Sequence, residues 1–90
     1  MLESQIQKRI LDHLKRLPDC WVVKVISCNK NGTPDILACV RGRFVALEVK
    51  TDTGRTSAIQ DFQLEQIAAA GGISAVVRSL DEAVAVLKNI

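Results

Sequence analysis

The stretch GTPDILACVRGRFVALEVK, residues 32–50, constrains the fold of this 90-residue chain more than any other segment. It contains two apolar runs typical of strands, and Arg41-Gly42 separates them. A two-residue connection between such runs predicts a β-hairpin. Three charged side chains interrupt the apolar pattern, namely Asp35 at the start and Glu48 and Lys50 at the end. Charged side chains are rarely fully buried unless they are paired, so these three require an explanation.

The length of the turn fixes the register of the hairpin. Counting outward from a two-residue turn at Arg41 and Gly42 places Asp35 directly opposite Glu48. Opposed residues on one face have Cβ atoms about 4.5–5.5 Å apart. Lys50 lies two residues beyond Glu48, and side chains alternate along a strand, so it shares that face. The sequence therefore predicts a cluster of two carboxylates and one amine.

The rest of the chain shows helical and strand patterns in the order α-β-β-β-α-β-α. Helices are expected over residues 2–17, from Ser57 to about residue 70, and from Ser79 onward; strands are expected over residues 21–26, 35–40, 44–50 and 73–78. Ser57 with Gln60, and Ser79 with Glu82, fit capping boxes. The fold class is therefore α/β, a mixed four-stranded sheet flanked by helices. The absence of repeats and linkers predicts one domain over residues 1–90.

Composition excludes several classes of protein. Hydrophobic residues make up 48% of the chain and charged residues 24%, which is typical of a globular protein and not of a disordered one. No apolar run approaches the roughly 18 residues of a membrane span, and MLESQIQKRI lacks the apolar core of a signal peptide. We expect a cytoplasmic protein, without a membrane partner, of a bacterium or a phage-infected cell.

The three cysteines lack CxxC spacing; they are Cys20, Cys28 and Cys39. We therefore expect reduced, partly buried thiols and no structural zinc site.

The predicted pair of acids also predicts chemistry. Two adjacent carboxylates require that one is protonated or that a cation lies between them. Oxygen ligands suit Mg²⁺ or Mn²⁺, and such an ion can hold a phosphate oxygen and lower the pKa of a bound water. Lys50 would then orient or deprotonate that water, or stabilise the developing charge. The alternative is that Asp35 caps a turn while Glu48 and Lys50 form a surface ion pair; the predicted register favours the metal site.

The acids and the lysine also match a known motif. Pro34-Asp35, followed after one hairpin by Glu48-Val49-Lys50, resembles the PD-(D/E)xK nuclease motif. Residues 32–79 are similar in order and spacing to the VRR-NUC (virus-type replication-repair nuclease) domain in its small stand-alone form. The resemblance implies a restriction-endonuclease-like core. It also implies that the metal is Mg²⁺ or Mn²⁺.

The resemblance implies roles for individual residues. Asp35 and Glu48 would bind the metal with help from the backbone carbonyl of Val49, and Lys50 would be the catalytic lysine. An acidic contribution from the first helix would come from Glu3, directly or through water, although an acid there also suits the helix dipole. Gln60 matches a glutamine of the family that follows the lysine strand, although a capping box alone would explain it.

Basic residues around the acids are candidates for DNA contacts, since they would offset repulsion between carboxylates and phosphates. They are Arg55, Arg78, Lys30, Lys24, Arg41 and Arg43. Trp21 and Phe62 are expected in the core or in a subunit interface. No sequence-reading helix is evident, so we expect a structure-selective endonuclease of DNA repair that acts on branched DNA.

Three readings of the function follow. The first is a homodimer that resolves four-way (Holliday) junctions, because paired cuts need two centres related by a two-fold axis. The second is a flap or nicking nuclease. The third is a DNA-binding module that kept the fold without cleaving, and the presence of all three motif side chains argues against it.

Overall fold

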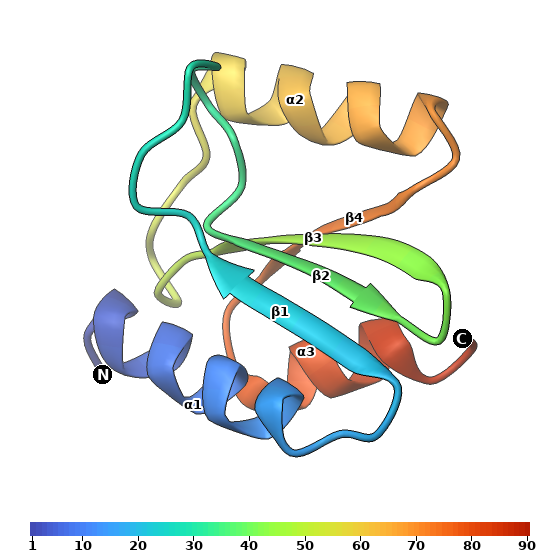
Figure 1. The fold of residues 1–90 in the computed structure, drawn as a ribbon. Coiled ribbons are helices and arrows are strands. Elements are labelled where there is room, and N and C mark those ends of the chain that lie inside the picture. Colours follow the sequence, from blue (N-terminus) through green and yellow to red (C-terminus); the bar gives the residue numbers. More distant parts are fainter.

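The computed structural model describes residues 1–90, and its elements follow the expected order α-β-β-β-α-β-α. The helices are α1 (Glu3–Lys15), α2 (Ala58–Ala69) and α3 (Leu80–Leu87), and the strands are β1 (Cys20–Lys24), β2 (Ile36–Val40), β3 (Arg43–Val49) and β4 (Ile73–Val77) (Figure 1). The predicted fold class is confirmed. Element ends differ from the expected ones by one or two residues. None of the helices is both long enough and apolar enough to cross a membrane.

The four strands form one sheet in the order β1-β2-β3-β4, antiparallel except for the parallel pair β3–β4. The register of the central hairpin pairs Val40 with Arg43, as predicted from the two-residue turn. Both turn residues have positive φ, 49° for Arg41 and 80° for Gly42. Such dihedral angles give the turn a twist that matches the strands it joins.

The sheet separates two helical layers. Helices α1 and α3 cover one face, and α2 lies on the other (Figure 1). The core lies on the α1–α3 side because alternate residues of the strands point there. It includes Ile10 and Leu14 of α1, Ile36, Ala38 and Val40 of β2, Val45, Leu47 and Val49 of β3, and Leu87 of α3.

The caps of the two later helices differ from each other. At α2 the predicted capping box is present: Ser57 accepts from the Gln60 N–H (3.3 Å), and Gln60 accepts from the Ser57 N–H (2.9 Å). At α3 Ser79 accepts from the Glu82 N–H (3.1 Å), but the Glu82 carboxylate accepts from the Arg78 N–H instead of that of Ser79. The second capping box is therefore half formed, because the Glu82 carboxylate accepts from the N–H of Arg78, the residue before Ser79.

The cysteines are free, and only Cys20 is half-buried as expected. Cys28 and Cys39 are exposed, so the expected partial burial was wrong for both. Cys28 lies in the loop after β1, and Cys39 lies on the side of β2 that points away from the core.

Candidate functional site

The two acids meet where β2 begins and β3 ends. Continuation of the hairpin register past Ile36 and Leu47 places Asp35 opposite Glu48. Asp35 is anchored twice: its Oδ2 accepts from the Val49 N–H at 2.8 Å, and its carbonyl accepts from the Val25 N–H at 2.8 Å. These bonds hold the Asp35 side chain beside the end of β3.

Glu48 is the most constrained side chain of the site. It is 1% exposed, its Oε2 accepts from Gln60 Nε2 at 3.4 Å, and the same oxygen lies 3.7 Å from Lys50 Nζ. Its Oε1 is buried and has no hydrogen-bond partner. Burial of an unpaired carboxylate oxygen is costly. A buried unpartnered oxygen in a native fold calls for an explanation, such as a catalytic role or a bound ion.

The surroundings of Glu48 raise its pKa from an ordinary 4.5 to about 8. Burial is the largest cause, and the neighbouring Asp35 carboxylate adds to it. Lys50 opposes the shift, and the charge of Glu3 contributes a small further increase. In the metal-free protein Glu48 therefore keeps its proton at neutral pH, and a bound cation would displace that proton.

The oxygen atoms of this pair fit a hard cation. Mg²⁺ usually binds through one or two carboxylates and keeps several waters or phosphate oxygens as its other ligands. Asp35 and Glu48 supply the two carboxylates, and the unpartnered Oε1 supplies a free lone pair. Glu3 is not gathered with them, since no group of three or more His, Cys, Asp or Glu side chains is arranged to hold a metal ion. At the first position of α1, Glu3 acts on Glu48 only through its charge.

Gln60 takes part in both the cap and the site. Its Oε1 accepts the Ser57 N–H at the start of α2, while its Nε2 donates to Glu48. The capping box thereby fixes the orientation of the amide that holds the buried carboxylate. The two roles that the sequence left as alternatives are compatible.

Three of the six candidate DNA-contacting residues lie near the acids. Lys30 is exposed in the loop that leads to Asp35, and Arg55 is exposed in the loop that follows Lys50. Lys24 pairs with Ile36, next to Asp35, but the alternation of side chains places it on the opposite face of the sheet.

The other three are placed differently. Arg41 and Arg43 lie at the turn of the hairpin, about 17 Å along β3 from Glu48, and Arg41 Nε donates to the Ile90 carbonyl at 2.9 Å. Arg78 follows β4, and its Nη1 donates to the carbonyls of Thr51 (2.5 Å), Gly54 (2.7 Å) and Asp52 (3.5 Å).

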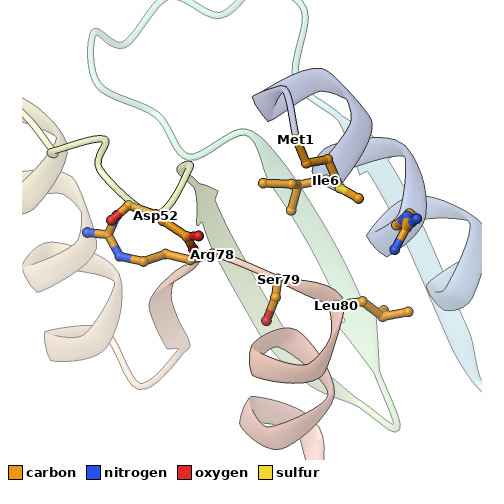
Figure 2. A pocket seen from close by; sticks show the side chains of 7 residues that line it. Met1, Ile6, Asp52, Arg78, Ser79 and Leu80 are labelled. Atoms are coloured by element: carbon orange, nitrogen blue, oxygen red, sulfur yellow. The ribbon is translucent and has the colours of Figure 1, made fainter.

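Arg78 therefore fastens the loop between Lys50 and α2 to the end of β4. Figure 2 shows Arg78 and Asp52 on one side of a pocket of about 230 Å³, whose other side is formed by Met1 and Ile6. No pattern in the sequence indicates this clamp, because an arginine after a strand is equally compatible with exposure to solvent. The pocket does not include the acids or Lys50.

Comparison with known proteins supports the fold. No protein-family model matches the chain, and no curated protein matches it. A solved structure described as "VRR_NUC domain" aligns with a TM-score of 0.80 and 24% identity over 96% of this chain and 94% of its own. A "VRR_NUC domain protein" aligns with a TM-score of 0.83 and 19% identity over 98% of this chain and 86% of its own. The chain therefore has the fold of VRR_NUC domains.

Proposed function

We propose that this chain is a VRR-NUC-type nuclease that hydrolyses phosphodiester bonds in DNA with Mg²⁺ or Mn²⁺. The observation that carries the proposal is the buried Glu48 carboxylate opposite Asp35, with one oxygen unpartnered and Lys50 beside the other. Such an arrangement is unfavourable for the fold alone. The likeness to two VRR_NUC domains supports the nuclease class.

The side chains of the site would divide the work. Asp35 and Glu48 would hold the ion with the Val49 carbonyl, and Glu3, which is not gathered with them, would contribute through a water. When bound, the ion polarises a phosphate oxygen and lowers the pKa of a water. Lys50, with Nζ 3.7 Å from Glu48, orients the attacking water and stabilises negative charge on the phosphate. Gln60 keeps the Glu48 carboxylate in place through its amide.

The proposed substrate is branched DNA, four-way junctions above all. Lys30 and Arg55 lie on the two loops that flank the acids and supply phosphate contacts. Because one chain has a single pair of acids, symmetric cuts in two strands require a homodimer. These assignments would make the protein a junction-resolving endonuclease of DNA repair.

A cleavage panel tests the proposal. Labelled four-way junction, flap and duplex DNA are incubated with the chain and Mg²⁺, Mn²⁺ or EDTA. We expect metal-dependent cuts on the junction, none with EDTA, and none by Asp35→Asn. The matched control is Asp19→Asn, an exposed acid before β1 at the hairpin-turn end of the sheet, which should cut normally. Binding without scission by the wild type would favour a non-cleaving module, and cuts confined to flaps or single nicks would favour the second nuclease reading.

A further inference from the structure

Ile26 is the most exposed of the large apolar side chains, with 83% of its surface in water. It lies in the loop between β1 and β2. Trp21 and Phe62 are also exposed, 66% and 50% respectively, so neither lies in the core of the chain. A single apolar residue on a surface requires no explanation by itself, so only the position of Ile26 can indicate a function.

Ile26 lies next to the candidate metal-binding acids. The Val25 N–H donates to the Asp35 carbonyl at 2.8 Å, which extends the pairing of β1 with β2 by one residue beyond Lys24 and Ile36. Paired residues of antiparallel strands have Cα atoms about 4.5–5.5 Å apart, and consecutive Cα atoms are about 3.8 Å apart. The Cα atom of Ile26 is therefore within about 10 Å of that of Asp35. DNA rises about 3.4 Å per nucleotide, so the Ile26 side chain can reach bases within about three nucleotides of a phosphate held at the acids.

The loop that carries Ile26 is held at both ends. It leaves the end of β1 and rises to the start of α2 before it returns to β2 (Figure 1). At α2, Gln63 Nε2 donates to the Asn31 carbonyl at 3.1 Å, and Gly32 lies so close to Ile59 that a Cβ atom would be 2.7 Å from the Ile59 carbonyl oxygen. A side chain on such a loop keeps its position before a ligand binds, which reduces the entropic cost of binding.

The residues around Ile26 favour nucleic acid over protein as the partner. Residues 27–31 of the loop, SCNKN, are all exposed, and none of them is aliphatic or aromatic. The centre of a protein interface is a cluster of well-packed anchor residues, many of them aromatic, and this loop lacks such a cluster. Lys30 can instead neutralise a phosphate while an apolar side chain enters the bases, a division of contacts found in proteins that bend DNA.

We propose that Ile26 is a wedge, a side chain that enters the base stack beside the cleavage site and selects DNA at branch points. The inference rests on the proposed function, because it adds a specificity-determining residue to the same site. Apolar wedges such as isoleucine insert between bases, unstack them and kink the duplex. Unstacking costs least where bases are mismatched or unpaired, and stacking is already interrupted at a branch point. A small chain without a sequence-reading helix then distinguishes branched DNA from continuous duplex by the cost of inserting one side chain.

Fluorescence tests insertion without cleavage. The base analogue 2-aminopurine, whose emission rises when it is unstacked, is placed next to the branch of a four-way junction, and protein is added in EDTA. The wild type should raise the emission, and Ile26→Ala at saturating concentration should lose this rise. Ile26→Met, which keeps a long apolar side chain, should retain it. An equal rise with the wild type and with Ile26→Ala would overturn the proposal.

Cleavage provides a second test, with a substrate that supplies what the variant lacks. On a fully paired junction, Ile26→Ala should lower the single-turnover cleavage rate about 10-fold or more, the order of the loss when the apolar contact of one isoleucine is removed. Mismatched pairs beside the branch open the stack in advance, so on that junction the rate of Ile26→Ala should return to the wild-type rate. A loss that persists on the mismatched junction would mean a merely structural role and would overturn the wedge.

The matched control is Leu2→Ala, which changes an apolar residue that is 67% exposed ahead of α1. It should equal the wild type on both junctions, in emission and in rate. Circular dichroism should show that Ile26→Ala, Ile26→Met and Leu2→Ala are all folded, as expected for substitutions at exposed positions. Equal defects in Leu2→Ala and Ile26→Ala would refute a specific role of Ile26.

The outcomes for the wedge and for the nuclease are separable. A wild type that never cuts but unstacks the branch through Ile26 would refute the nuclease and retain the wedge. A wild type that cuts junctions no faster than Ile26→Ala, with the same emission, would do the reverse. An Ile26→Ala variant that unstacks and cuts normally but loses self-association in light scattering would assign Ile26 to a protein interface and refute the wedge.

Discussion

Glu48 is the only ionisable residue among the buried ones, and the fold does not satisfy all of its polar atoms. Gln60 and Lys50 approach one of its oxygens, while the other has no partner. A neutral residue of similar volume would be more favourable for stability alone. Departures from local rules of this kind are expected at functional sites.

The raised pKa of Glu48 predicts a pH dependence of stability. In the unfolded chain this carboxyl ionises near 4.5, whereas the folded, metal-free protein keeps the proton to about pH 8. The folded state binds more protons than the unfolded chain between these values, so the stabilisation by the Glu48 carboxyl is lost as the pH rises through this range. Urea unfolding in EDTA from pH 5 to 8 should show this fall in the wild type, and Glu48→Gln should lack it. Equal slopes in the two proteins would contradict the raised pKa.

Lys50 allows chemistry to be separated from metal binding. Lys50→Ala should lower the single-turnover cleavage rate about 10²–10³-fold, because a charge aimed at the transition state is lost. Calorimetric titration with Mn²⁺ should show little change, since the carboxylates remain. Lys88→Ala, an exposed lysine after α3, serves as the control. Wild-type cleavage by Lys50→Ala would refute the assigned chemistry.

At the scale of elements, the Arg78 clamp makes the loop from Lys50 to α2 part of the site. Nη1 of Arg78 contacts three loop carbonyls, and the ammonium of a lysine ends short of them because its side chain is about one bond shorter. Arg78→Lys should therefore loosen the loop although the charge is kept. Trypsin should then cut after the exposed Arg55 at least about 10-fold faster, because proteolysis follows local opening.

The same substitution distinguishes the clamp from a DNA contact. A phosphate contact made by Arg78 would survive largely in Arg78→Lys and leave proteolysis unchanged. The clamp predicts accelerated proteolysis and slower DNA cleavage together. Arg43→Lys, at the far end of the hairpin, controls for the charge-conserving change itself.

Gly32 couples the loop before Asp35 to helix α2. Its φ is +79°, and a Cβ there would lie 2.7 Å from the Ile59 carbonyl oxygen. Gly42 has a nearly identical φ of +80° but no atom within 4 Å of such a Cβ. Gly42→Ala should therefore cost about 1–2 kcal/mol from the left-handed conformation alone. Gly32→Ala should cost measurably more in urea unfolding, and equal losses would mean that the loop and helix separate freely.

The parts of this structure that the sequence predicted depend on local rules. Turn length and strand alternation fix the hairpin register, and with it the meeting of Asp35 and Glu48. The capping box at Ser57 is complete, as predicted. The same pattern at Ser79 gives only half a capping box, because the Arg78 N–H binds the Glu82 carboxylate. The Arg78 clamp depends on packing between distant segments, which periodicity does not encode.

At the scale of the whole molecule, only 17 of 90 residues are buried. A chain of this size buries a modest fraction of its unfolded surface and is marginally stable by itself. Ligands that bind only the folded state then change its stability by a large proportion. A cation held between Asp35 and Glu48, which relieves an unpartnered buried oxygen, should act in this way.

Thermal unfolding without DNA tests this expectation. At an Mg²⁺ or Mn²⁺ concentration about ten times Kd, binding adds about 1.4 kcal/mol, which in a domain of this size raises Tm by about 5–10 °C. At one fixed metal concentration, the rise in Tm should be larger at pH 8 than at pH 6, because at pH 6 the ion must first displace the Glu48 proton. Asp35→Asn should lose most of this rise in Tm, while Asp19→Asn, an exposed acid at the hairpin-turn end of the sheet, should keep it. A Tm that rises equally in both variants would mean that the cation binds elsewhere on the molecule.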